Sequence, residues 1–153
     1  MEKLISALSA DFPALEFIGG DTFSWSPNTN QITYNTKLTK KGQLKTWSLL
    51  HEVGHALLDH QDYDSDFELL LLEAAAWDKA VVLATNYGIT IDPDHVQDCL
   101  DTYRDWLHRR STCPRCGIKN FQASSTQYDC HNCGTQWHVS SGRFCRSYRR
   151  LAI

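Results

Sequence analysis

The stretch His51-Glu52-Val53-Gly54-His55 decides how the rest of this chain is interpreted, and it lies inside the largely apolar segment 47–58. On an α-helix, side chains four residues apart share a face, so His51 and His55 can both direct a ring nitrogen at one metal ion. Glu52 lies about 100° further round the helix, where its carboxylate can take a proton from a water molecule that the metal activates. The spacing therefore predicts a zinc site suited to hydrolysis.

Apolar residues surround this motif. They are Leu49, Leu50, Val53, Ala56, Leu57 and Leu58. A helix of this composition is at least half buried, and buried polar side chains are costly unless a partner meets them. We therefore expect the two histidines and the glutamate to serve a metal site rather than to decorate an exposed helix.

A second helix is predicted from about residue 65 to residue 86, ended by Gly88 and followed by Pro93. Within it, residues 69–77 are apolar except for Glu73. A lone carboxylate at helical spacing from leucine, alanine and tryptophan side chains is disfavoured unless a positive group meets it. Glu73 is therefore the predicted third zinc ligand.

Other residues are alternatives for the third ligand. His60 is one, although it lies five residues after His55, about 140° away if the helix continues. His95 and His108 have no partner pattern and are expected at the surface. The acidic side chains that follow the motif are expected to be solvated: Asp59, Asp62, Asp64, Asp66 and Glu68.

The flanking segments predict a small α+β domain over residues 1–110. A short helix is expected at residues 2–10, and alternating bulky and polar residues at 22–26 and 31–35 predict a β-hairpin. The edge of such a hairpin can hold a substrate backbone by strand addition, and a hairpin that only covers the core fits equally well. A third helix is expected at residues 93–110.

Four cysteines form two matched pairs in the C-terminal segment 111–153. Cys113 and Cys116 make the first Cys-x-x-Cys turn, Cys130 and Cys133 make the second, and a glycine follows each turn. Two such turns complete a closed tetrahedral zinc site of four thiolates, with short strands around them, as in a zinc ribbon. A module of about forty residues has little core, so this structural zinc is expected to supply much of its folding free energy.

Charge and composition support two parts with different roles. The 153-residue chain is 42% hydrophobic and 22% charged, as is usual for a globular protein. Residues 1–110 carry 9 basic and 17 acidic side chains, whereas residues 111–153 carry 6 and 1. The first residues lack the pattern of a secretion signal, and no run is long enough to span a bilayer. We therefore expect a cytoplasmic protein with reduced thiols and no membrane partner.

The basic C-terminal segment suggests that the ribbon recruits a partner. Its cations are Arg115, Lys119, Arg143, Arg146, Arg149 and Arg150, interleaved with the aromatic residues Trp137, Phe144 and Tyr148. Such side chains can bind nucleic acid through phosphate contacts and base stacking. Binding of a protein partner and a purely structural role are the alternatives.

The chain resembles the ImmA/IrrE group of small gluzincin-type zinc metallopeptidases over roughly residues 20–88. The resemblance rests on the motif followed by Ala56-Leu-Leu58, on the segment Glu73-Ala-Ala-Ala-Trp-Asp-Lys-Ala80, and on the preceding hairpin. It implies a zincin-like fold, zinc held by His51, His55 and Glu73, and Glu52 as general base, with repressor proteins as a substrate class. A zinc protease domain followed by a zinc ribbon is also similar to the SprT-like proteins, which act on DNA-bound protein.

The expected function is a zinc-dependent metalloendopeptidase with one catalytic and one structural Zn²⁺. In it, Glu52 is the catalytic base and the ribbon recruits a partner. The alternative is a non-enzymatic zinc-binding adaptor or nucleic-acid-binding module with a peptidase-like fold. Candidates for the oxyanion-stabilising group are Tyr34, His60 and Tyr63, and Cys145 has no assigned role.

Overall fold

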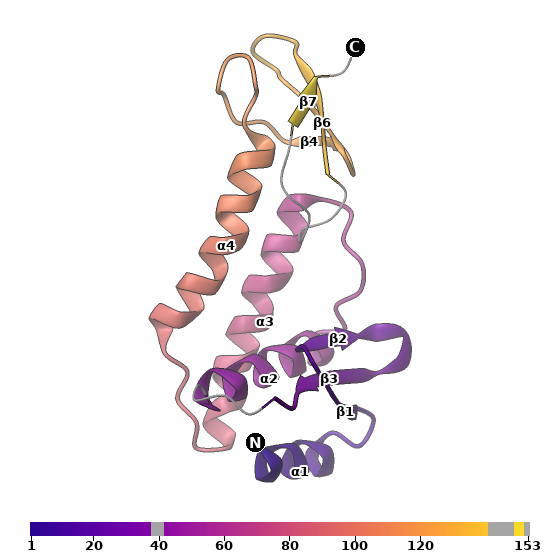
Figure 1. The fold of residues 1–153 in the computed structure, drawn as a ribbon, viewed down its shortest axis with the longest axis vertical. Helices are drawn as coiled ribbons and strands as arrows, with labels where there is room; N and C mark the ends of the chain where they lie inside the picture. The colour runs from indigo at the N-terminus through magenta and orange to yellow at the C-terminus, as the bar shows by residue number, and fades with distance from the viewer. Residues whose placement is uncertain (38–41, 141–148, 152–153) are drawn as a thin grey trace. The chain divides into compact units, whose positions relative to one another are not determined.

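The computed structural model describes residues 1–37, 42–140 and 149–151, with the backbone alone at 149 and 150 (Figure 1). The protein is α+β, as expected. Its helices are α1 (Glu2–Asp11), α2 (Gly42–Leu57), α3 (Asp66–Asn86) and α4 (Pro93–Ser111). Its strands are β1 (Glu16–Gly20), β2 (Ser24–Ser26), β3 (Gln31–Asn35), β4 (Gln122–Ser124), β5 (Gln127–Asp129), β6 (Gln136–Val139) and β7 (Arg149–Leu151). No helix in the described ranges combines the length and apolar character needed to cross a membrane.

The chain divides into two compact units. Unit 1 comprises Met1–Asp62 and Leu72–Val96, and unit 2 comprises Tyr63–Leu71 and Gln97–Ile153. The expected domain boundary at residue 110 lies inside unit 2, because the start of α3 and most of α4 are grouped with the ribbon.

The sheet of unit 1 is mixed and has the strand order β1-β3-β2. β2 and β3 pair antiparallel with Trp25 opposite Ile32, which confirms the predicted hairpin, and the 3₁₀ turn η1 (Pro27–Thr29) joins them. β1 pairs parallel to β3, with Phe17 also opposite Ile32. The sequence does not indicate β1, because this strand is short and ends in two glycines, which are weak strand formers. β2 forms one edge of this sheet.

The helices of unit 1 cover the sheet and carry the motif. α2 packs against β2 and β3, and α1 packs against β1. The apolar face of α2 is buried through Leu49, Leu50 and Val53, as predicted from the residues around the motif. The helices predicted at 2–10, around the motif and from about 65 to 86 are all present.

The ends of α3 and α4 follow local sequence signals. The Ser65 hydroxyl oxygen accepts the backbone N–H of Glu68 at 3.1 Å, which caps the start of α3. Gly88 follows the end of α3 with φ of 65°, a left-handed conformation that suits glycine, and its place was predicted. α4 begins at Pro93, and the carboxylate of Asp92 accepts the backbone N–H of Asp94 at 3.0 Å.

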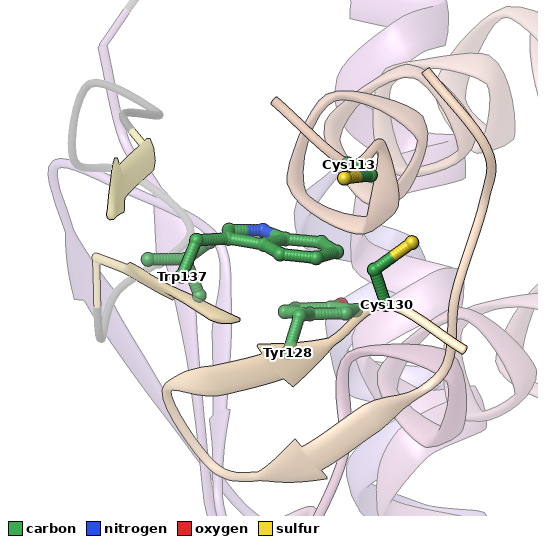
Figure 2. Close-up of a cluster of buried hydrophobic side chains, with 5 residues drawn as sticks. Cys113, Tyr128, Cys130 and Trp137 are labelled. Carbon is green, nitrogen blue, oxygen red and sulfur yellow. The ribbon is translucent and has the colours of Figure 1, made fainter. Parts of the chain in front are cut away.

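Unit 2 contains the predicted ribbon as an antiparallel sheet of order β4-β5-β6-β7. Its core is the stacked pair of Tyr128 and Trp137, 5.4 Å between ring centroids, with Cys113 and Cys130 beside them (Figure 2). The strand β7 falls in the segment that the sequence suggests as a basic tail. Its backbone pairs with β6, with Arg149 opposite Val139.

A buried ion pair joins α3 to α4 within unit 2, and ribbon side chains bond to both of its members. The guanidinium of Arg110, 1% exposed, donates to both oxygens of Asp66, at 2.5 and 3.1 Å. Asp66 is 3% exposed and also accepts the Tyr128 hydroxyl at 2.6 Å. The indole N–H of Trp137 donates to the backbone oxygen of Arg110 at 2.9 Å. The expectation that Asp66 is solvated is therefore wrong, because this carboxylate has a buried cationic partner 44 residues later.

Candidate metal centres

The side chains of His51, His55 and Glu73 converge in unit 1. The two Nε2 atoms of the histidines are 3.1 Å apart. One carboxylate oxygen of Glu73, Oε2, lies 3.1 Å from Nε2 of His51 and 3.7 Å from Nε2 of His55. The fold therefore brings together the three predicted ligands, two from α2 and one from α3, as a group that can bind a metal ion.

The spacing of these atoms fits a zinc ion. Zinc bonds to nitrogen and oxygen of about 2.0–2.1 Å place the ligands of a tetrahedral site about 3.3 Å apart. The separations of 3.1 to 3.7 Å bracket this value. Two imidazoles and one carboxylate are also the donor set of a common class of catalytic zinc site, which keeps its fourth position for a reactant.

Burial and mutual contact set the protonation of the three side chains. Burial lowers the pKa of His51, which favours the neutral imidazole that a metal requires. Burial alone would raise the pKa of Glu73, but hydrogen bonds and charge from His51 and His55 outweigh it and leave that pKa well below its usual range. The lowered pKa of His51 favours its neutral form and the lowered pKa of Glu73 favours its ionised form, which are the forms that bind metal.

Glu52 lies on α2 between the two histidines and is half buried. Burial, together with the charge of Glu73, raises the pKa of Glu52 to about 7, against the effects of His55 and of a hydrogen bond from the backbone N–H of Trp25. A cation held beside it would stabilise the carboxylate and lower this pKa. Without a cation beside it, Glu52 thus has a pKa near neutral pH, and its carboxylate form can accept a proton.

Aromatic stacking orients His51. Its ring stacks on Trp77 of α3, with 4.3 Å between centroids and 26° between planes. The Nδ1 atom of His51 is buried and has no hydrogen-bond partner within the described part of the chain.

His95 packs against Trp77 and Trp47, with 5.6 and 4.9 Å between ring centroids, and is half buried, so its expected surface position is wrong. The cause is this aromatic cluster, which single-helix patterns do not reveal.

Gly54 lies inside the motif and has a packing role that the spacing of the ligands does not explain. A Cβ built on Gly54 would lie 3.2 Å from the carbonyl carbon of Ala76 on α3 and closer still to its oxygen. A glycine inside a helix is a usable signal, because it weakens the helix unless close packing requires it. Here it lets α2 approach the backbone of α3, which carries Glu73.

The remaining candidates lie elsewhere. His60 does not replace Glu73 as the third ligand. Its Nδ1 lies 2.8 Å from Nδ1 of His55, and that atom is on the opposite side of the His55 ring from Nε2, which faces His51 and Glu73. A Cβ at Gly19 of β1 would lie 3.7 Å from the hydroxyl oxygen of Tyr34, so this tyrosine reaches over β1. Tyr63 belongs to unit 2. The acidic residues Asp59, Asp62 and Asp64 are exposed, as expected.

The four ribbon cysteines form the second candidate metal centre. Sγ atoms of Cys113 and Cys133 are 3.7 Å apart, and those of Cys116 and Cys130 are 3.5 Å apart. Zinc–thiolate bonds of about 2.3 Å give a tetrahedral edge of about 3.8 Å, so the cluster fits a four-thiolate zinc site. His131 and His138, the possible competing ligands, are both exposed.

The two cysteine turns have the same backbone design. Gly117 donates its N–H to the oxygen of Cys113 at 3.0 Å, and Gly134 donates to the oxygen of Cys130 at 2.9 Å. Both glycines have positive φ, 77° and 70°, as expected for the residue that follows each turn. Hydrogen bonds from the hydroxyl and backbone of Thr135 lower the pKa of Cys133 to about 6, which favours the thiolate that zinc binds.

The surface of the ribbon differs from the expected nucleic-acid face. Trp137 is 0% exposed and cannot stack on a base, which corrects that part of the prediction. Phe121 is the aromatic side chain of the ribbon that is most exposed among the described residues, at 76%. Four residues of the proposed basic face lie outside the described residues: Arg143, Phe144, Arg146 and Tyr148. Cys145 also lies there. Only the backbone of Arg149 and Arg150 is described, whereas the side chains of Arg115 and Lys119 are described and exposed.

Comparison of the chain with protein-family models, with curated proteins and with solved structures finds no match.

Proposed function

We propose that the chain is a zinc-dependent metalloendopeptidase, with a zincin-like catalytic unit and a ribbon held by a structural zinc. The observation that carries this proposal is Glu52, a proton acceptor that stands beside the metal-binding group without belonging to it. A protein that only bound a metal ion would need His51, His55 and Glu73 but no base next to them. The combination is the one that metal-assisted hydrolysis requires.

Each residue of the unit 1 site has a separate part in the proposed reaction. His51, His55 and Glu73 would hold Zn²⁺, which supplies Lewis-acid polarisation and charge stabilisation at the scissile carbonyl. Glu52 accepts the proton of the attacking water on its carboxylate and then releases it to the leaving amine. The backbone N–H of Trp25 in β2 favours the ionised form of this carboxylate.

The position of β2 favours a peptide substrate. β2 is an edge strand of the unit 1 sheet and packs against α2, the helix of the motif. An edge strand offers unpaired main-chain groups that can hold an extended peptide whatever its side chains. Trp25, in the middle of β2, contacts the proposed base through its backbone. A peptide paired to this edge would therefore lie beside Glu52.

The ribbon is proposed to recruit a partner, and this part stays a prediction. With Trp137 buried, the described side chains of the basic face are Arg115 and Lys119, which are both exposed. Lys119 also bonds to His108 at 2.6 Å. The proposal of a protein or nucleic-acid partner for the ribbon therefore rests on the basic sequence of this segment.

Two measurements on the full chain test the proposal. Elemental analysis should find two zinc ions in the wild type, about one in Glu73→Ala, and about one in Cys116→Ser. Incubation with a library of mixed-sequence peptides, read by mass spectrometry of new termini, should show cleavage by the wild type. Glu52→Gln should hold two zinc ions and produce none of these termini.

Two results would contradict the proposal. Cleavage by Glu52→Gln at the wild-type rate would remove the base assignment. A wild-type protein that holds two zinc ions and produces no Glu52-dependent termini would instead favour the zinc-binding adaptor.

A further inference from the structure

The helix that carries the motif ends in a turn that brings His60 back beside His55. Asp59 has φ of 52°, a left-handed conformation that stops the helix. The N–H of Asp59 donates to the oxygen of Ala56 at 3.1 Å, and the N–H of His60 donates to the oxygen of His55 at 3.1 Å. This pair of bonds is a Schellman motif, which folds the chain back over the last helical turn.

The contact between the two imidazoles requires a proton on one of the two facing nitrogens. Their Nδ1 atoms are 2.8 Å apart, so one of them donates a proton and the other accepts it. Nε2 of His55 faces His51 and Glu73, and a metal there needs its lone pair. A neutral His55 then carries its proton on Nδ1, and Nδ1 of His60 is the acceptor.

Trp25 holds His60 in this position. Its indole N–H donates to the backbone oxygen of His60 at 2.9 Å, across 35 residues of sequence. The backbone N–H of the same residue donates to Glu52. One residue of the edge strand β2 thus anchors the turn that carries His60 and favours the ionised form of the proposed base.

We propose that His60 is a positioning residue that orients His55 for metal binding by accepting its Nδ1–H, with Trp25 as the anchor of His60. This rests on the proposed function only in placing a metal ion at His51, His55 and Glu73. His51 receives its orientation from stacking on Trp77, so the two ligands of α2 are held by different devices. His60 is a hydrogen-bonding group behind the ligand His55, and a partner of this kind raises the affinity for the metal.

The affinity of the full-length protein for its two zinc ions tests this role. We expect His60→Ala to weaken one of them about 10- to 100-fold in competition with a chromophoric chelator. The ribbon zinc, bound by four cysteines, should keep its affinity and serves as an internal standard. His60→Asn should stay within a few-fold of the wild type, because the amide oxygen of asparagine can accept a hydrogen bond close to the place of Nδ1. His138→Ala, at an exposed histidine of β6, is the matched control.

The outcomes separate this inference from the proposed function. Wild-type affinity for both ions in His60→Ala would overturn the inference and leave the proposed function standing. An equal loss in His60→Ala and His60→Asn would also overturn it, because hydrogen-bond acceptance would then not be the property that matters. A wild-type protein that binds only the ribbon zinc would overturn both.

A second variant separates the anchor from the acceptor. Trp25→Phe keeps an aromatic ring but removes the indole N–H that holds the His60 backbone, together with the second ring of the indole. We expect Trp25→Phe to lower the zinc affinity of the histidine site, but by less than His60→Ala does, because the imidazole of His60 is still present as the acceptor. No change in Trp25→Phe would overturn the assignment of Trp25 as the anchor.

Discussion

Gly54 of α2 lies directly against the backbone carbonyl of Ala76 of α3, with no room for a Cβ between them. α2 carries His51 and His55, and α3 carries Glu73 three residues before Ala76. The distance between these two helices is therefore set by a glycine inside the motif at residues 51–55. A metal site with ligand atoms 3.1 to 3.7 Å apart depends on this close approach.

Replacing Gly54 with alanine should therefore destabilise unit 1, although alanine is the better helix former by about 1 kcal/mol. The new methyl group meets backbone atoms, which cannot rotate away, and overpacking of this kind costs about 1–3 kcal/mol. The methyl group should also push α2 away from α3, which separates the histidines from Glu73 and weakens zinc binding at their site. Urea denaturation and zinc affinity measure the two effects.

Gly42→Ala is the matched control, because Gly42 lies in the same helix and a Cβ there meets nothing within 4 Å. It should be neutral or slightly stabilising. If Gly54→Ala behaved in the same way as Gly42→Ala, the close approach of the helices would not be a requirement.

The site was largely predictable because its signals are local. His51, Glu52 and His55 follow one helical period, and Glu73 stands out as one charge in an apolar helix. What brings them together is packing between helices, which the sequence expresses only weakly, as the glycine at position 54. His60 could not be placed from helical geometry, because Asp59 leaves the helix in a left-handed turn.

The buried ion pair of unit 2 could not be predicted from the sequence. The spacing of the ribbon cysteines predicts the sulfur cluster, but no local pattern pairs Asp66 with Arg110, since 44 residues separate them. Asp66 follows several exposed acidic residues and looks like another of them. The strand β1 was missed for a related reason, since its pairing with β3 outweighs its two glycines.

The buried pair of Asp66 and Arg110 should contribute strongly to the folding of unit 2. Asp66→Asn leaves the Arg110 guanidinium buried without its counter-charge, and loss of one partner of a buried pair costs about 3–5 kcal/mol. The midpoint of chemical denaturation, followed by circular dichroism, should fall accordingly.

The exposed pair of Asp101 and Arg104 provides the comparison. Its atoms are 2.8 Å apart, but both side chains are largely in solvent. Asp101→Asn should therefore change stability by less than about 1 kcal/mol. Equal effects of the two substitutions would mean that burial does not decide the contribution of the Asp66 pair.

Loss of the zinc ion proposed for the four ribbon cysteines should open the core that Tyr128 and Trp137 form. Two of the four candidate ligands, Cys113 and Cys130, belong to that core, so the metal and the aromatic pair support each other. Cys116→Ser, or chelation of zinc, should move tryptophan emission to longer wavelength as Trp137 becomes hydrated, and added zinc should reverse the change only in the wild type. Unchanged emission in zinc-free Cys116→Ser would show that the ribbon core holds without metal.

The contact of Tyr87 with Asp11 predicts a dependence of stability on alkaline pH. The Tyr87 hydroxyl donates to the Asp11 carboxylate at 2.7 Å, and burial together with this bond raises the pKa of Tyr87 to about 12. Since the pKa is higher in the folded than in the unfolded chain, where it is about 10, the stabilisation is complete below pH 10 and is lost between pH 10 and 12. The difference in stability between the wild type and Tyr87→Phe should shrink across this range. A constant difference would contradict the assignment.

Asp59 offers a way to displace His60 without changing its chemistry. Its left-handed φ of 52° suits glycine, and a β-branched side chain there costs about 1–2 kcal/mol. Asp59→Gly should keep the turn and the zinc affinity, whereas Asp59→Val should lower both the stability and the affinity of the histidine site. Both variants lose the exposed bond from Gln61 to the Asp59 carboxylate, so the difference between them isolates the backbone. If Asp59→Val bound zinc as well as Asp59→Gly, the turn would not be what holds His60 against His55.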